Sequence, residues 1–267
     1  MIQPDYARTA LDLRTAITGW RMWARLGWQE VKRRYRRTAI GPFWSTLSLS
    51  IFMLTLGVLW SRLWKQDIRE YLPFLCAGML PWVLMSTIVN EACTVFLGSE
   101  SIIKSMWFSF TVLACVVVWR NLIVLCHNAV VFVLIAIVCS VPVTANTLLV
   151  IPGLVLFSAN ALWVTILLGM ICSRYRDVTP LVGSILQIAL FVTPIFWSSA
   201  QLGAGRVSNV MVDLNPIYHF IDIIRSPLLG NAPTLWTYEM VIFVTVLGWL
   251  GTLAFFSRFS RRIAFWI

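Results

Sequence analysis

The stretch KRRYRRTAIGPFW, residues 32–44, places five basic residues in six positions directly before an apolar run. After Arg37 no charged residue occurs until Arg62, so the densest positive charge of the chain adjoins a long uncharged segment. This boundary is typical of a transmembrane helix with a basic cytoplasmic flank. The composition agrees, because 59% of the 267 residues are hydrophobic and 12% are charged, whereas a soluble domain has about 25% charged residues. The sequence therefore predicts an integral membrane protein.

The net charge of +10 is concentrated at the ends of apolar runs, and nine of the 21 basic residues precede Gly41. This distribution favours an anionic membrane surface over nucleic acid as the partner of the charge. The six cysteines lie within or beside apolar runs without any C-x-x-C pair. We interpret them as small packed residues rather than as disulfides or metal ligands.

Six apolar segments approach or exceed the roughly 20 residues that a spanning helix requires. They cover about residues 43–62, 72–96, 116–140, 148–171, 179–200 and 237–257. The predicted fold is an all-α membrane protein with six transmembrane helices, with residues 106–114 as an interfacial approach to the third. Sixteen Lys and Arg residues fall on one side and five on the other, which predicts that both termini are cytoplasmic.

Residues 10–35 are predicted to form an amphipathic helix in the headgroup plane. Its apolar stripe recurs at three- and four-residue steps and comprises Leu13, Ile17, Trp20, Ala24, Gly27, Val31 and Tyr35. The chain thus divides into an interfacial segment, 1–41, a six-helix transmembrane domain, 42–257, and a cytoplasmic tail, 258–267.

A second short helix is predicted between spans five and six, within outer gate helices at about 204–230. Asn215 is a favourable N-cap and Pro216 suits the first helical position. The following residues form an apolar stripe (Ile217, Phe220, Ile221, Ile224) and a polar stripe (His219, Asp222, Arg225). This pattern favours a helix that re-enters the outer leaflet beside a pathway, because re-entrant backbone requires surrounding protein or water.

Ionisable residues inside the membrane are costly and are candidates for function. Glu91 and Arg120 lie at matching predicted depths and are expected to form an ion pair, or else to reach the interface separately. The chain has no H-E-x-x-H, G-x-S-x-G or G-x-x-x-x-G-K-[ST] motif, so we expect no catalytic residues, no metal site and no ATPase site in it.

Five stretches in this order resemble the membrane subunits of polysaccharide-exporting ABC transporters. They are KRRYRRTAIGPFW, NEACTVFLGSESIIK, WRNLIVLCHN, RYRDV and LNPIYHFIDIIRSPLLG. The chain looks closest to O-antigen exporter permeases of the ABC-2 type and more distantly similar to capsule and teichoic-acid exporter permeases. Each stretch alone is weak, but their combination in this order is specific, and the resemblance extends over essentially the whole chain.

The resemblance implies a homodimer in the bacterial inner membrane, assembled with two copies of an ABC ATPase subunit. The implied cargo is an undecaprenyl-diphosphate-linked polysaccharide. No cofactor is expected in this chain, since ATP and Mg would be bound by the partner ATPase.

The resemblance also implies roles for particular residues. The portal for the lipid diphosphate comprises Arg33, Arg34, Tyr35, Arg36, Arg37, Gly41 and Pro42. The ATPase docking residues are Ser99, Glu100, Ile103, Lys104, Arg174, Tyr175, Arg176 and Asp177, although stop-transfer charges at span ends explain these loops equally well. The outer gate comprises Asn215, Pro216, Tyr218, His219, Asp222 and Arg225.

Aromatic residues near or inside the spans are candidates for a channel that holds sugar. They are Phe43, Trp44, Trp82, Phe196 and Trp197, and lipid-facing or belt positions remain the alternative for each. Two other functions stay open: an ABC-2 permease for another cargo, such as capsule, teichoic acid, a lipid or a drug, and a membrane-embedded enzyme of envelope synthesis. The enzyme reading requires acidic or histidine residues clustered at one membrane face, whereas Glu91, His127 and His219 are scattered.

Overall fold

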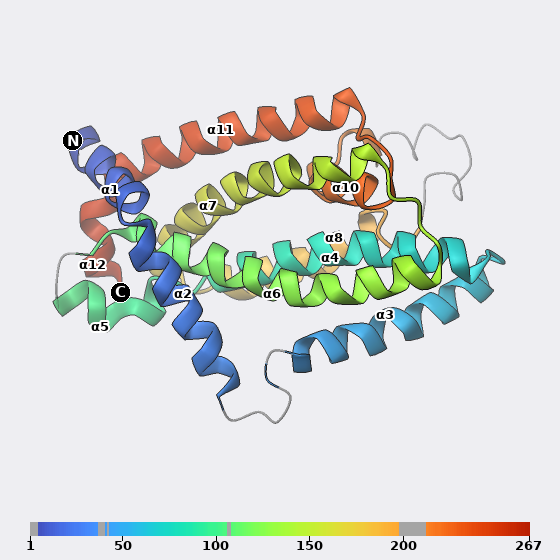
Figure 1. Ribbon diagram of the computed structural model, residues 1–267. Helices are drawn as coiled ribbons and strands as arrows, with labels where there is room; N and C mark the ends of the chain where they lie inside the picture. Colours follow the sequence, from blue (N-terminus) through green and yellow to red (C-terminus); the bar gives the residue numbers. More distant parts are fainter. Residues whose placement is uncertain (1–4, 37–40, 42, 106–107, 198–211) are drawn as a thin grey trace.

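A computed structural model describes residues 5–36, 41, 43–105, 108–197 and 212–267. Within these ranges all the regular structure is helical. Five long helices carry the fold: α3 (Phe43–Leu63), α4 (Ile68–Ala92), α6 (Phe110–Val138), α7 (Val150–Arg174) and α11 (Leu235–Phe259). They run side by side along the length of the molecule (Figure 1). In the part of the chain that the structure describes, five helical segments are long and apolar enough to cross a membrane, and each includes one of these helices.

The α4 helix is the centre of the bundle. It packs against α3, α6, α7, α8 (Val178–Val192) and α10 (Pro216–Leu228), and most of its side chains are buried. The Asp67 side chain accepts a hydrogen bond from Arg69 N at 2.9 Å, which starts the helix at Ile68 rather than at residue 72. The α3 helix contacts α4 and α6 and leaves a row of large apolar side chains exposed on its remaining face.

The fifth predicted span differs from the structure. The helix α8 has only 15 residues, because it ends at Val192, two residues before Pro194. Thr193 is extended, with φ −80° and ψ 136°, as expected for a residue that precedes proline. At about 1.5 Å per residue, α8 is about 22 Å long, shorter than a hydrocarbon core of about 30 Å. The last residues of this predicted span, 198–200, lie outside the described ranges.

The predicted approach at 106–114 is not separate from the third span in the part that the structure describes. Phe110 through Ala114 form the first turns of α6 and are buried. The sequence analysis missed this because the cap of α6 is tertiary: Ser109 caps Val112 N, and Asp12 accepts from the first two backbone N–H groups of the helix.

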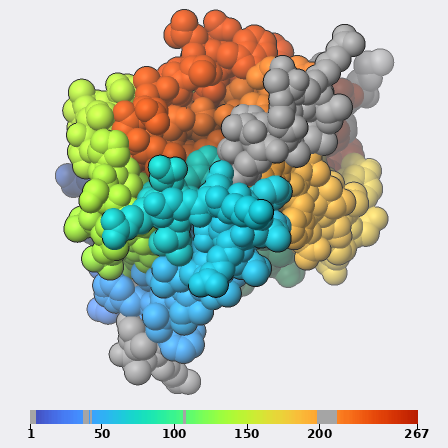
Figure 2. Space-filling model, turned by 90° about the vertical axis from the view of Figure 1, so that its right-hand side faces the viewer, coloured from blue at the N-terminus to red at the C-terminus, as the bar shows by residue number. Residues whose placement is uncertain are grey.

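Both chain ends gather at one end of the molecule with the short helices α5 (Glu100–Ser105) and α12 (Ile263–Trp266) (Figure 1). Short 3-10 turns, η1 (Leu97–Ser99), η2 (Ala145–Leu149) and η4 (Ser260–Arg262), precede α5, α7 and α12. Figure 2 looks onto the opposite end, where α4 reaches the surface below the helices of the C-terminal third.

The N-terminal segment is helical, but it is two helices rather than one. The first, α1 (Tyr6–Thr18), ends at Gly19, and α2 (Trp20–Tyr35) follows at once. The α2 helix crosses α6 (Figure 1) and buries Gly27 and Val31. The predicted apolar stripe is only partly buried, since Ile17 and Trp20 remain 76% and 55% exposed.

Candidate functional site

The basic cluster lies at the C-terminal end of α2. Lys32, Arg33 and Arg34 form its last turn and Arg36 follows as the C-cap, so a basic group lies where the helix dipole favours positive charge. All four side chains are exposed. Among the described residues Arg34 forms an ion pair, whereas Lys32, Arg33 and Arg36 form no salt bridge to another described side chain. Arg37 and Pro42 lie outside the described residues.

The neighbouring portal residues connect this cluster to the start of α3. The Tyr35 hydroxyl donates a hydrogen bond to Ser45 Oγ at 3.4 Å. Gly41 has φ +63°, a left-handed conformation that glycine adopts without the penalty of a Cβ. Gly41, two residues before the start of α3, is therefore a position that favours glycine.

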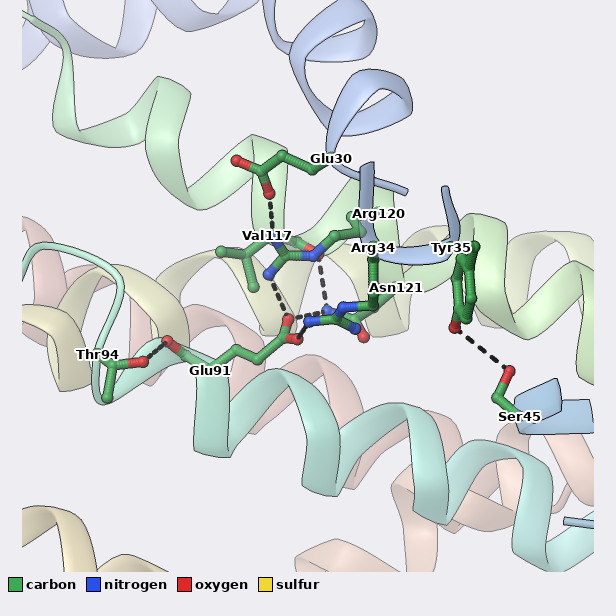
Figure 3. A network of polar contacts seen from close by, with 9 residues as sticks. All are labelled: Glu30, Arg34, Tyr35, Ser45, Glu91, Thr94, Val117, Arg120 and Asn121. Atoms are coloured by element: carbon green, nitrogen blue, oxygen red, sulfur yellow. Dashed lines mark hydrogen bonds and ion pairs between the residues drawn. The ribbon is translucent and has the colours of Figure 1, made fainter. Parts of the chain in front are cut away.

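Arg34 belongs to a charge network that joins three helices (Figure 3). Its Nη2 lies 2.9 Å from Glu91 Oε1 on α4, and Arg120 Nη2 on α6 lies 2.6 Å from Glu91 Oε2. Asn121 Nδ2 donates to the same Oε2 at 2.5 Å, and Arg120 Nη1 pairs with Glu30 on α2. The two arginines and two glutamates balance, so the network itself is electrically neutral.

Burial decreases outward along this network. The side chains of Arg120 and Glu91 are 14% and 19% exposed, whereas that of Arg34 is 47% exposed. The hydrogen bond to Glu91 raises the pKa of Arg34 above its already high ordinary value, so this guanidinium remains charged. The inner pair thus anchors the network, and Arg34 is its accessible arm.

The structure brings Glu91 and Arg120 together as the sequence predicted, but it adds three residues that sequence reasoning missed. Glu30 and Asn121 complete the network, and buried Asp12 caps α6 through Phe110 N and Thr111 N at 3.0 Å each. The sequence contains one indication of these contacts, because Asp5, Asp12 and Glu30 are the only acidic residues among the first 41. Each makes a tertiary contact, since Asp5 Oδ2 lies 2.5 Å from Arg261 Nη2.

The predicted docking residues lie near the end of the molecule that carries both termini. Lys104 pairs with Glu100 at 2.7 Å on α5, and this hydrogen bond holds the pKa of Glu100 below its ordinary value. Ser99 ends η1, and Ile103 packs against the core. The α12 helix contacts both α5 and α7, so the two predicted docking segments are neighbours.

The second docking segment, Arg174 to Asp177, is exposed throughout. The Arg174 guanidinium lies over the rings of Tyr175 and Trp266, at 5.1 and 5.4 Å from their centroids. Arg176 and Asp177 extend into the turn before α8. Together with α5, this turn offers an exposed surface with charges of both signs.

The predicted channel aromatics do not form one cluster. Phe43 and Trp44 are exposed at the start of α3, where Phe43 meets His127 edge to face at 5.7 Å. Phe196 is buried beside Trp60 near the other end of α3, and Trp197 donates from Nε1 to Phe191 O. Trp82 lies on α4 and is only 5% exposed. Its side chain is therefore packed inside the single chain and does not line a surface of it.

The predicted gate helix is present as α10. Asn215 Oδ1 accepts from Ile217 N at 3.0 Å and Pro216 is the first helical residue. Its polar stripe is buried within the chain, since His219, Asp222 and Arg225 are 2%, 6% and 5% exposed. The parts of the predicted gate at 204–211 lie outside the described residues.

Polar partners explain why this stripe is buried. Arg225 Nη1 donates to Pro194 O at 2.7 Å and its Nη2 lies 3.5 Å from Asp222 Oδ1. The guanidinium also lies over the rings of Phe74 and Tyr218, at 4.8 and 5.3 Å. His219 contacts Thr237 Oγ1 and the Asp213 carbonyl through its two ring nitrogens.

Among the described residues no group of three or more His, Cys, Asp or Glu side chains could hold a metal ion. The exposed guanidinium groups at the end of α2 are chemically suited to bind anions.

Comparison with known proteins adds two findings. Residues 22–229 match the family described as ABC-2 type transporter. The chain is also similar to O-antigen export system permease protein RfbA of Myxococcus xanthus, with 25% identity over 190 residues, 71% of this chain and 73% of that protein. A protein of the same name from Klebsiella pneumoniae is 22% identical over 244 residues, 88% of this chain and 91% of that protein.

Proposed function

The chain belongs to the ABC-2 type transporter family, and from this premise we propose that it is the permease subunit of a polysaccharide exporter. Its cargo is an undecaprenyl-diphosphate-linked polysaccharide of the O-antigen class. The relatives named as O-antigen export permeases, aligned over most of this chain, support that cargo.

The observation that carries the proposal is the uncompensated charge at the end of α2. Within the network, Glu30 and Glu91 neutralise Arg34 and Arg120. Lys32, Arg33 and Arg36 remain without a described carboxylate partner, at the C-terminal end of α2. Guanidinium groups bind phosphate oxygens through paired N–H donors, so a lipid diphosphate suits this cluster.

The accessible Arg34 side chain can also respond to a bound ligand. Arg34 is half exposed and shares Glu91 with Arg120 and Asn121. When a diphosphate binds at the end of α2, Arg34 can turn to it without leaving Glu91 unpaired. The basic cluster therefore binds the headgroup while the inner pair keeps α2 attached to α4 and α6.

The proposed assembly is a homodimer in the bacterial inner membrane with both termini in the cytoplasm. Two copies of an ABC ATPase subunit bind ATP and Mg and dock on α5 and residues 174–177. In this assignment the buried α10 helix lies at the outer end of the export pathway. The chain itself is not an enzyme.

The decisive experiment compares cells with and without the gene and measures polysaccharide at the surface and lipid-linked polymer inside. We expect loss at the surface with accumulation inside, restored by the wild-type gene. Loss of polymer in both places would instead indicate an enzyme of envelope synthesis. An unchanged surface would indicate another cargo.

A further inference from the structure

A groove of about 450 Å³ lies between α2 and α6, on the flank of α2 away from the charge network. Its volume is within the range of small-molecule sites, about 300–1,000 Å³. The residues that line it are Trp20, Arg21, Ala24, Arg25, Trp28 and Trp119, with Gln29 at its edge. Three indoles and two guanidinium groups therefore surround one space.

The helical period explains how one groove collects these side chains. Trp20, Ala24 and Trp28 follow each other at steps of four, and so do Arg21, Arg25 and Gln29. Residues four apart share a face of a helix, so an aromatic row runs beside a basic row. Glu30 and Arg34 fall on the other flank, where they reach Arg120 and Glu91.

Trp119 supplies the opposite wall and is held in place. Its ring packs edge to face on Trp23, with centroids 5.9 Å apart. Gly27 permits this approach, because a Cβ at that position would lie 2.9 Å from Trp119 Cδ1 and 3.4 Å from Val116 O. The groove is thus a fixed feature of the α2–α6 contact.

The two arginines in the groove are available to a ligand. Neither Arg21 nor Arg25 forms a salt bridge with a described carboxylate, and both are exposed. The Arg21 guanidinium lies 5.5 Å from the centre of the Trp20 ring. None of the described residues that line the groove is acidic, so no carboxylate among them compensates the charge of the two arginines.

The position of Trp119 on α6 places the groove at a membrane boundary. The helix has 29 residues, which at about 1.5 Å each is about 43 Å, against a hydrocarbon core of about 30 Å. With the exposed Val138 end at the far boundary, about nine residues at the Phe110 end extend beyond the core. Trp119 is then at the headgroup level, where tryptophan is enriched.

We infer that this groove binds an anionic glycerophospholipid of the surrounding leaflet. Its phosphate lies between Arg21 and Arg25, and its glycerol and first acyl carbons lie against Trp20, Trp28 and Trp119. The site is separate from the basic end of α2, because the two lie on different flanks of the helix. It requires only that α2 lies at a membrane surface, so it stands apart from the identity of the exported cargo.

The choice of a resident lipid rests on the shape of the site. The indole rings lie directly beside the proposed phosphate position. This arrangement suits a lipid whose apolar chains begin a few atoms from its phosphate. The bound lipid fills the space between α2 and α6 and adds contacts that join the two helices. It thereby fixes α2 at the leaflet surface.

The test is native mass spectrometry of the purified, delipidated protein titrated with phosphatidylglycerol or with phosphatidylcholine. We expect one phosphatidylglycerol per chain that survives at low lipid concentration, and weaker retention of phosphatidylcholine. R21Q/R25Q is expected to reduce the affinity for phosphatidylglycerol on the order of tenfold. R14Q/R262Q removes the same charge from exposed positions outside the groove and is expected to bind as the wild type does.

A second variant tests the aromatic walls without changing charge. Trp20 and Trp28 are 55% and 58% exposed, so W20A/W28A is expected to fold and to lose the same lipid. Equal retention of phosphatidylglycerol by R21Q/R25Q and by wild type would overturn the proposal, as would equal retention of both lipids by wild type. Displacement of the lipid by equimolar farnesyl diphosphate would assign the groove to isoprenoid cargo and would also overturn it.

Discussion

Two Arg–carboxylate clusters lie in different parts of this molecule and differ in how much water reaches them. In the α10 cluster, Arg225 and Asp222 are 6% and 9% exposed, and the pair lies within one helix. In the α2–α4–α6 network, Arg34 is 47% exposed and its partner Glu91 is 19% exposed, on a helix 57 residues away in sequence. The first cluster is shielded from solvent within the chain, whereas in the second the Arg34 side chain is exposed enough for a ligand to reach.

The physical reason is desolvation. Breaking a buried pair leaves a charge in low dielectric and is strongly destabilising, while an exposed pair contributes about 0–1 kcal/mol. The same chemical groups therefore have different consequences in the two places. Four sets of substitutions test this difference, in order of decreasing expected effect.

Replacement of Arg225 by Met has the largest expected effect. R225M removes the donor to Pro194 O and leaves Asp222 buried without its cation. We expect the free energy of unfolding to fall by about 3–5 kcal/mol, measured by thermal unfolding in detergent. The double variant D222N/R225M should recover part of this loss, since it leaves no buried charge. A double variant as unstable as R225M would contradict the role assigned to the pair.

Replacement of Glu91 by Gln is expected to have an intermediate effect. It weakens the anchor of largely buried Arg120, and we expect a loss of about 2–3 kcal/mol in the free energy of unfolding. Double-mutant cycles with R120Q and R34Q separate the inner and outer contacts. The Glu91–Arg120 coupling should be the larger, because Arg34 is half exposed. Equal coupling energies in the two cycles would show that the Glu91–Arg120 contact is no stronger than the Glu91–Arg34 contact, which contradicts the proposed roles of the two arginines.

Removal of charge from the end of α2 should affect transport rather than stability. R33Q/R36Q/R37Q leaves the Arg34–Glu91 contact in place, so we expect normal membrane insertion and an unfolding temperature near that of wild type. Surface polysaccharide should fall at least about tenfold, the equivalent of about 1.4 kcal/mol in headgroup binding. R62Q/K65Q/R69Q removes three charges at the α3–α4 turn and is the matched control. Equal export by both variants would eliminate the proposed portal.

Charge reversal at the predicted docking surface should have the smallest effect on the fold. Lys104 and Asp177 are exposed, so K104E and D177K should each change the free energy of unfolding by no more than about 0.5 kcal/mol. Co-purification of the ATPase partner should nevertheless decrease, because opposed charges orient such contacts. K65E, at the α3–α4 turn, should leave the complex intact. If the ATPase partner co-purifies with K104E and D177K as it does with wild type, the docking assignment is wrong.

Much of the fold could be predicted because it depends on short-range features. The first predicted span, 43–62, nearly coincides with α3, Phe43–Leu63, since an uncharged run bounded by Pro42 and Arg62 leaves little choice. The α10 helix begins where Asn215 and Pro216 indicate a cap and a first turn. These signals act within a few residues and need no tertiary partner.

The site was predicted only in part. Matching predicted depths in the membrane indicated that Glu91 lies near Arg120. Depth does not specify how each helix is rotated about its axis, so Glu30 and Asn121 were missed. The short α8 was missed because its apolar run continues past Pro194, where the helix cannot. The burial of His219, Asp222 and Arg225 depended on Pro194 O, Thr237 and Phe74, which come from three other segments.

The sequence by itself determined that this is a helical membrane protein with a basic N-terminal segment, because hydrophobic length and charge placement are properties of consecutive residues. Only the tertiary structure decided which charges neutralise one another and which remain free. The crossing of α2 over α6, allowed by Gly27, turns Glu30 and Arg34 to one flank and Arg21 and Arg25 to the other. That division depends on the rotation and approach of packed helices, since side chains far apart in sequence meet only after packing.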